Sequence, residues 1–193
     1  MPLAAAHRAR ARRASLKDVN AIVRLLANDS MPPEQAVITR EHQPELRLAL
    51  AHFGLEAGEV WIAETNSGVL EAAAVWIPPN AAIDEEQYTA LLRLHGFGAL
   101  ATVSSRRHDG PMQPREEHWL LAAFGAAATA DLTAADAVLM PVLRAADHAR
   151  LPAYACAPAS YRAEALRPFG FVSWTSESLP DSAGWLHRAP TPR

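Results

Sequence analysis

The stretch AAFGAAATADLTAADAVLMPVL, residues 122–143, constrains the fold more than any other part of the sequence. Its apolar beginning predicts a buried strand, and the spacing of apolar residues in its second half predicts a helix after a short loop. Strand, tight loop and helix form an arrangement that proteins use to bind a phosphate at the helix N-terminus. Here, however, no glycine occurs between Gly125 and Gly170, and the polar residues near the start of the helix include Asp131 and Asp136.

The segments around this unit predict an α+β fold with a mixed sheet. Two runs rich in Val, Ile and Trp, residues 59–65 and 70–78, are joined by Asn66-Ser67-Gly68, which predicts a β-hairpin. Ser15 and Asp18 have capping-box spacing before the helical run AIVRLLA. The other expected elements are a first strand at 12–14, helices at 43–52, 84–94, 134–148 and 161–167 (the last stopped by Pro168), a loop at 106–114, and strands at 118–126, 152–157, 169–174 and 184–188.

The length of 193 residues fits one domain, which we expect over residues 12–188, between a flexible basic N-terminus (1–11) and a short tail (189–193). Cys156 is the only cysteine, a pattern usual in the reducing cytosol, so we expect a cytoplasmic protein. The net charge of −3 and the scattered basic residues argue against nucleic-acid binding. Apolar runs are too short for a membrane span, and the sequence leaves a homodimer open.

Several motifs resemble the GNAT superfamily of acyltransferases. The runs HWLLAAFGA, MPVLRAADHARLPAYA and RPFGFVSW resemble the second half of such a domain, and ARRASLKDV resembles its first strand and helix. The runs AHFGLEAGEVWIAET, AAAVWIPP and EEHWLLAAFG are similar to puromycin N-acetyltransferase and its actinobacterial relatives, along nearly the full chain. The resemblance implies an acetyl-CoA cleft between the fourth and fifth strands, with the pyrophosphate on a Gln/Arg-x-x-Gly-x-Gly loop. It also implies a tyrosine on the next short helix that protonates the leaving thiolate.

The sequence departs from the family pattern at both of these places. Aligned without a gap, the loop motif falls on residues 131–136; allowing for one missing residue moves its key positions to Ala130, Thr133 and Ala135, and neither register contains a glycine. Glycines let ligand oxygens approach backbone amides without a Cβ in the way. The tyrosine position is Leu166, which cannot donate a proton, and Tyr161 would point to another helical face.

The acidic residues of the loop add an electrostatic objection to a cofactor site. Thr133 and Asp136 have capping-box spacing, which predicts Thr133 as N-cap and Asp136 at the third helical position. A carboxylate there repels a pyrophosphate and occupies the same N–H donors. We therefore expect a helix end capped by its own side chains, with no cofactor required. If acetyl-CoA does bind, the residues expected to contact it are Phe124, Ala126, Thr133, Ala134 and Asp136.

Candidate residues for acid–base or nucleophilic chemistry lie at strand ends: Glu116, His118, Cys156, Tyr161 and His187. His118, next to Glu116 and Glu117, is either a general base or a surface histidine at a strand end. Cys156 stands where relatives often have glutamate, and it is either a nucleophile or a small buried hydrophobic residue.

Two tryptophans are candidates for binding a planar substrate. Trp76 and Trp119 would form an aromatic wall, although a tryptophan on a buried strand is more often part of the core. Asp131 and Asp136, five residues apart without further ligands, do not make a convincing metal pattern, and we predict no metal site.

Three functions are compatible with these observations. We favour a GNAT-fold enzyme of small-molecule specialised metabolism that performs CoA-independent acid–base chemistry such as cyclisation, elimination or isomerisation. The first alternative is a divergent N-acetyltransferase that uses acetyl-CoA to modify a small amine or an antibiotic. The second alternative is a non-catalytic protein that binds a ligand or pairs with an active homologue. The expected partner of either enzyme is a small molecule.

Overall fold

The computed structural model describes residues 9–27, 43–81, 116–128, 130, 132–156, 164–174 and 185–191. Their strands form one seven-stranded sheet in the order β1-β2-β3-β4-β5-β7-β6. β4 and β5 are parallel, and all other neighbouring strands are antiparallel. The strands are β1 (Arg10–Arg13), β2 (Glu59–Glu64), β3 (Leu70–Ile77), β4 (Trp119–Ala126), β5 (Ala153–Cys156), β6 (Val172–Ser173) and β7 (Trp185–Arg188).

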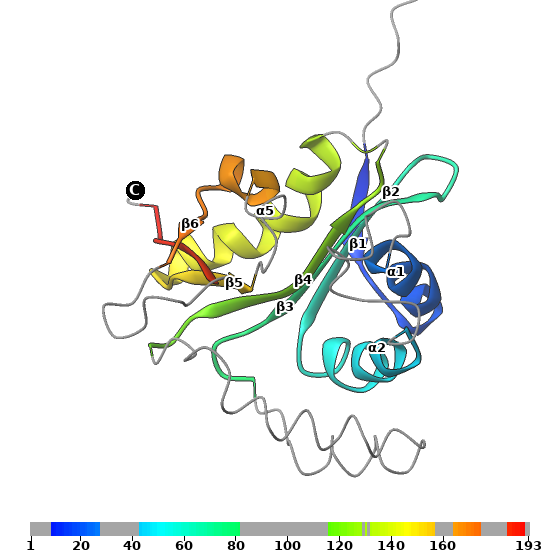
Figure 1. The fold of residues 1–193 in the computed structure, drawn as a ribbon, viewed down its shortest axis with the longest axis horizontal. Helices are drawn as coiled ribbons and strands as arrows, with labels where there is room; N and C mark the ends of the chain where they lie inside the picture. Colours follow the sequence, from blue (N-terminus) through cyan, green and yellow to red (C-terminus); the bar gives the residue numbers. More distant parts are fainter. Residues whose placement is uncertain are drawn as a thin grey trace, which may run out of the picture.

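Helices cover both faces of this mixed sheet, as the predicted α+β fold requires (Figure 1). The long helix α5 (Leu132–Ala149) lies on one face, and α1 (Val19–Leu26) and α2 (Gln43–Ala49) lie on the other. Short helical turns flank them: η1 (Leu16–Asp18) precedes α1, η3 (Leu50–Gly54) continues α2 as a π-helix, and η5 (Arg167–Phe169) precedes β6. None of the described helices is long and apolar enough to cross a membrane.

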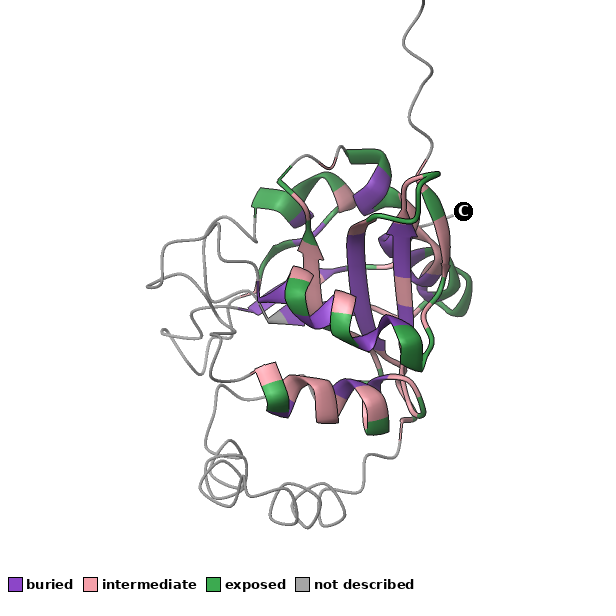
Figure 2. Cartoon of the chain, turned by 90° about the vertical axis from the view of Figure 1, so that its right-hand side faces the viewer, coloured by how far each residue is buried: buried purple, intermediate pink, exposed green. Residues whose placement is uncertain are grey.

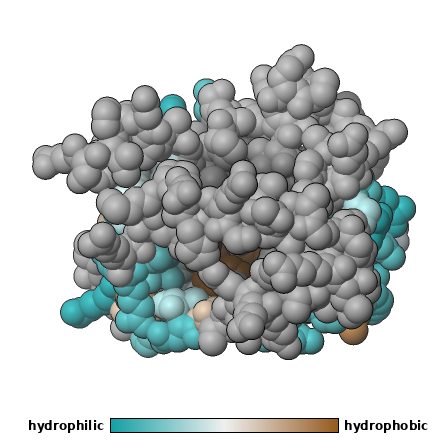
Figure 3. Space-filling view, turned by 60° about the horizontal axis from the view of Figure 1, so that its bottom comes forward, coloured by the Kyte–Doolittle hydropathy of each residue, from teal (hydrophilic) through white to brown (hydrophobic). Residues whose placement is uncertain are grey.

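Each face of the sheet has its own apolar core, because side chains alternate between the two faces of a strand. The α5 core contains the helical residues Val138, Leu139, Val142 and Leu143, packed on Ala72, Ala74 and Trp76 of β3. The α1 core contains Ile22 and Val23, packed on Val60, Ile62, Ala73 and Val75. Figure 2 shows the buried residues of strands and helices in purple, and in Figure 3 the coloured atoms visible between the grey ones are hydrophobic near the middle and hydrophilic toward the edges.

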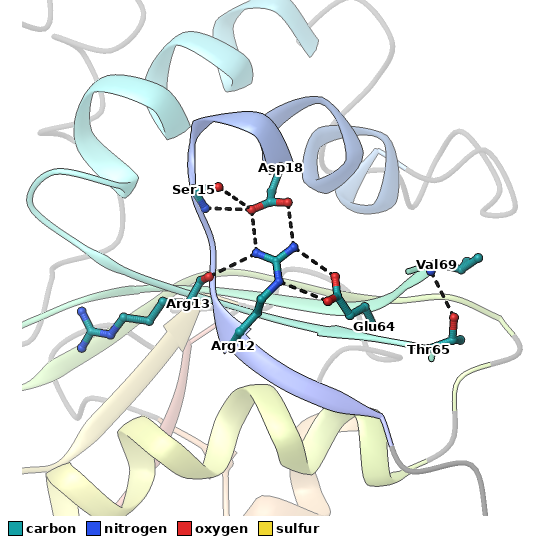
Figure 4. A network of polar contacts seen from close by, with 7 residues as sticks. All are labelled: Arg12, Arg13, Ser15, Asp18, Glu64, Thr65 and Val69. Atoms are coloured by element: carbon teal, nitrogen blue, oxygen red, sulfur yellow. Dashed lines mark hydrogen bonds and ion pairs between the residues drawn. The ribbon is translucent and has the colours of Figure 1, made fainter. Parts of the chain in front are cut away.

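Several local predictions are confirmed. β2 and β3 form the expected hairpin, with Gly68 at φ 81 in its turn. Asp18 accepts hydrogen bonds from the backbone N–H of Ser15 (2.9 Å) and from its hydroxyl (2.8 Å), as the capping-box spacing predicts (Figure 4). The helix expected at 84–94 and the loop expected at 106–114 lie outside the described residues.

Some predicted boundaries differ from the structure. β1 begins at Arg10, inside the stretch expected to be flexible, and Thr191 of the expected tail donates its backbone N–H to Asp147 at 2.8 Å. The short helix predicted at 161–167 is α-helical over its described residues 164–166 and ends before Pro168, which stands in the first turn of the 3-10 helix η5, where its missing N–H has no helical partner to lose; Pro168 does not end that 3-10 turn. The turn ends instead at Gly170, whose φ of 86 places it in the left-handed region that favours glycine.

Candidate functional site

The parallel strands β4 and β5 pair over only part of their length. The register joins Trp119–Leu121 to Ala153–Ala155, whereas β4 continues to Ala126. A bulge lies at the point where the pairing ends: Trp76 pairs with Leu121 and Val75 with Ala123, so Ala122 is an extra, exposed residue. A bulge leaves backbone groups outside the ladder. Within the described residues, β4 therefore has no strand partner on the β5 side from Ala122 onward.

The start of α5 differs from the expected capped end. The helix begins at Leu132, so Thr133 is its second residue and not its N-cap, and Asp136 is its fifth. The capping-box prediction was wrong because spacing alone does not fix where a helix begins. No acidic residue lies in the first turn of α5, and the field of a helix end weakens beyond that turn. Asp136 is therefore too far along the helix to argue against a pyrophosphate bound at its start. Residue 131, the other acidic residue of the loop, lies outside the described residues.

The residues predicted to contact acetyl-CoA lie on the second half of β4 and within the first five residues of α5. Ala126, Thr133 and Asp136 are exposed, and Ala134 is buried. Phe124 is partly buried against the α5 core. The first turn of α5 has no acidic residue, and alanines in place of glycines leave Cβ atoms beside the backbone. The predicted contacts remain predictions.

A second group of side chains surrounds Tyr154 on β5, a residue that we did not predict. Its neighbours Ala153 and Ala155 belong to the α5 core, so Tyr154 points to the opposite face of the sheet. The register places it between Leu120 of β4 and His187 of β7. The Tyr154 ring contacts three others, with centroid distances of 5.0 Å to His118, 4.9 Å to His187 and 5.7 Å to Trp174.

Hydrogen bonds join this group to Glu116. The Tyr154 hydroxyl donates to the Glu116 carboxylate, and the Glu116 backbone oxygen lies 2.6 Å from Nδ1 of His118. A carbonyl oxygen only accepts, so Nδ1 carries the proton and the neutral ring keeps its lone pair on Nε2. Burial raises the pKa of Tyr154, and the bond to Glu116 raises it further, so this hydroxyl stays protonated and remains a donor.

Three of the five predicted acid–base residues thus come together: Glu116, His118 and His187. Cys156 is the last residue of β5 and pairs with Trp185, while the orientation of its side chain and the whole of Tyr161 lie outside the described residues. Sequence reasoning missed Tyr154 because PAYACA reads as an apolar strand. The tyrosine in this strand could have indicated the site, because a buried tyrosine hydroxyl usually has a hydrogen-bond partner.

The predicted aromatic wall is not present in this form. Trp76 is 0% exposed within the α5 core, and Trp119 is partly buried against the same core. Both therefore lie on the opposite face of the sheet from Tyr154, because their strand positions alternate with those of the site. The wall prediction was wrong for Trp76, which packs as a core residue. In the described part of the chain, no group of three or more His, Cys, Asp or Glu residues is placed to hold a metal ion.

Comparison with known proteins identifies the fold. No family model matches the chain. The structure of histone acetyltransferase HPA2 and related acetyltransferase from Corynebacterium glutamicum matches with a TM-score of 0.61 and 19% identity, over 96% of this chain and 98% of that one. An acetyltransferase of the GNAT family from Staphylococcus aureus matches with a TM-score of 0.58 and 13% identity, over 94% of this chain and 99% of that one.

A third structure, arylalkylamine N-acetyltransferase 2 from Aedes aegypti, matches with a TM-score of 0.56 and 12% identity, over 94% of this chain and 99% of that one. The chain therefore has the GNAT fold of acetyltransferases, as the resemblance implied. At these identities the likeness concerns the arrangement of helices and strands, and the chemistry has to be argued from the site.

Proposed function

We propose that this chain is an N-acetyltransferase that transfers an acetyl group from acetyl-CoA to a small amine. The observation that carries the proposal is the hydrogen-bonded Glu116–His118–Tyr154 group, which lies at the start of β4 and on the part of β5 that pairs with it. Tyr154 is paired with Leu120, one residue before the last paired residue, Leu121. His118, with its tautomer fixed, directly precedes β4 and is four residues before Ala122, where the unpaired part of the strand begins. This reverses our preference from the sequence, because Thr133 and Asp136 do not take the capping positions on which that preference depended.

The residues divide the proposed reaction between them. The backbone of β4 from Ala122 to Ala126 and the first turn of α5 would hold acetyl-CoA, which supplies the activated acetyl group when bound. His118 would accept the proton of the attacking amine on Nε2, because Nδ1 is already donating to Glu116, and would then pass this proton to the leaving CoA thiolate. The bulge at Ala122 interrupts the regular pairing of β4 with β3, and backbone N–H groups there would donate to the developing oxyanion. His187 lies on the other side of Tyr154 and completes the lining of the site.

The amine specificity is also part of the proposal. A neighbour of the same fold is called an arylalkylamine N-acetyltransferase, which supports a small amine as acceptor. The aromatic rings of Tyr154 and Trp174, together with the two imidazoles, favour a substrate with an apolar or aromatic body. An amine-bearing antibiotic or another product of specialised metabolism fits this description.

A second candidate function is CoA-independent acid–base chemistry in the same site. It is favoured by Leu166, which stands at the family's general-acid position and is 2% exposed within the α5 core. It is also favoured by the absence of glycine between Gly125 and Gly170. In this case Glu116, His118 and His187 would move protons on a substrate bound alone, in a cyclisation, elimination or isomerisation.

Two measurements on the intact protein decide between these functions. We expect calorimetry to detect micromolar binding of acetyl-CoA, and a thiol-release assay with a panel of aryl- and alkylamines to detect turnover. In His118→Gln we expect kcat to fall about 100-fold or more, as for loss of a general base, while acetyl-CoA binding is retained. The matched control is His52→Gln, which changes an exposed histidine of η3 and should leave both measurements unchanged.

The outcomes are separable. Absence of both acetyl-CoA binding and thiol release would reject acetyl transfer and leave the CoA-independent reading. Binding with full turnover in His118→Gln would keep the reaction and reject His118 as its base.

A further inference from the structure

We propose that Tyr154 is a positioning residue for His118 and that it acts through Glu116. Its hydroxyl holds the Glu116 carboxylate, and this keeps the Glu116 backbone oxygen against Nδ1 of His118. The expected effect on turnover rests on the proposed function. The expected effect on the imidazole does not, because it follows from the hydrogen bonds alone.

Glu116 needs such an anchor. It is exposed and precedes β4, whose ladder begins only at Trp119. The first backbone bond that secures this end of the strand is from Trp119 N–H to the Pro152 oxygen, at 3.0 Å. Within the described part of the chain, Glu116 forms hydrogen bonds with Tyr154 and His118. The side-chain bond to Tyr154 therefore determines where the Glu116 carbonyl lies.

Tyr154 is suited to act as the fixed point. The residue is 2% exposed, and its backbone lies between β4 and β7 in the sheet. Its ring meets those of His118 and Trp174 edge-on and that of His187 at a tilt of 46°. A ring held on three sides has little freedom to rotate, so the direction of its hydroxyl is set by packing.

The consequence for His118 is a choice of tautomer. A neutral imidazole carries its single proton on either Nδ1 or Nε2, and the hydrogen bond made by one nitrogen decides the state of the other. With the Glu116 carbonyl 2.6 Å from Nδ1, the proton stays on Nδ1 and Nε2 faces the site as an acceptor. If the carbonyl is free to move, molecules with the proton on Nε2 accumulate, and these cannot accept a proton there.

The geometry favours positioning over direct proton transfer by Tyr154. Its hydroxyl proton is already directed at the Glu116 carboxylate. Burial and that carboxylate also raise its pKa, which makes it a weak acid. The tyrosine is therefore not a substitute for the general acid missing at Leu166.

The test uses full-length protein labelled with ¹⁵N-histidine, with long-range proton–nitrogen correlation spectra recorded at the high-pH plateau of the histidine signals. His118→Gln assigns the signals of His118. In the unmodified protein we expect the Nδ1–H tautomer. In Tyr154→Phe, which keeps the ring and removes only the hydroxyl, we expect a shift toward the Nε2–H tautomer. Glu116→Gln keeps an acceptor oxygen for Tyr154 and should retain the Nδ1–H tautomer, whereas Glu116→Ala should lose it.

A matched control separates the hydroxyl from the ring contacts. Trp174→Phe alters a ring beside Tyr154 but leaves the Tyr154–Glu116 bond, so the tautomer should not change. An Nδ1–H tautomer that persists in Tyr154→Phe, or an Nε2–H tautomer in the unmodified protein, would overturn the inference even if turnover is normal.

Kinetics provide the second readout. In Tyr154→Phe we expect kcat to fall about tenfold or more with little change in KM, the size usual for loss of a residue that orients an imidazole. Glu116→Gln should retain more activity than Glu116→Ala. If no acetyl transfer is found in any variant, the proposed function fails while the tautomer measurement still decides this inference. A normal kcat in Tyr154→Phe together with a changed tautomer would show that the tautomer does not limit the reaction and would reject the positioning role.

Discussion

Arg12 is the residue with the densest set of charged contacts near the N-terminal end of the sheet (Figure 4). Its guanidinium binds both carboxylate oxygens of Asp18, at 2.8 and 2.9 Å, and both of Glu64, at 3.2 and 3.0 Å. Asp18 is the last residue of η1 and Glu64 the last of β2, so one side chain on β1 joins three segments. Bidentate hydrogen bonds between a guanidinium and a carboxylate are stronger than hydrogen bonds between neutral groups.

These contacts predict an acid-sensitive contribution to stability at Asp18. The hydrogen bonds from Arg12 hold the pKa of Asp18 well below its usual range. A carboxylate with a lowered folded-state pKa stabilises the protein above its unfolded value, about 3.9, and loses this contribution as the pH falls toward the folded value. We expect Asp18→Asn to cost about 1–3 kcal/mol of unfolding free energy at neutral pH, measured by urea titration.

The difference between the two proteins should shrink as the pH falls below about 4, where Asp18 itself becomes protonated. Glu56→Gln, at an exposed acidic residue, serves as control and should change stability little. A difference that is equal at neutral and acidic pH would show that the cost of the substitution is steric.

At the scale of single elements, the C-terminal end of α5 carries a conformational cost. Arg150 follows the helix with φ 57, a left-handed conformation usual for glycine at this position. Leu151 N–H bonds to the Ala146 oxygen (3.0 Å) and closes the helix end. Arg150→Gly should therefore raise the unfolding free energy by about 0.5–1 kcal/mol, measured by urea or thermal unfolding. Arg150→Ala retains the strain and should give no gain; an equal gain in both variants would point to the lost charge.

Across the whole molecule, helices and strands were predicted from the sequence more accurately than the contacts between them. The hairpin and the central helix follow from local periodicity, which residues a few positions apart determine. The start of α5 was misjudged at Thr133 because the Thr–x–x–Asp spacing suits a cap but does not require one. The contact of His118 with Tyr154 depends on strand register between segments 36 residues apart, and no local pattern contains it.

The ion pair between Arg188 and Asp147, which joins the last strand to α5, leads to a final prediction. Arg188 of β7 is 7% exposed, and its guanidinium binds both carboxylate oxygens of Asp147 on α5 at 2.8 Å. It also donates to the Phe169 oxygen of η5 at 2.9 Å and to the Thr191 hydroxyl at 3.0 Å. One buried cation thus joins the last strand, the central helix and the turn before β6. Removing one partner leaves a buried charge without compensation, which costs more than the pair contributes.

We expect Arg188→Met and Asp147→Leu each to lower the unfolding free energy by about 2–4 kcal/mol. The double variant should lose clearly less than the sum of the two, because neither charge is then left unpaired. Urea unfolding followed by circular dichroism measures all four members of this cycle. Strict additivity would mean that the two residues stabilise the molecule independently, and the last strand would then be held to α5 by apolar packing such as that of Leu186.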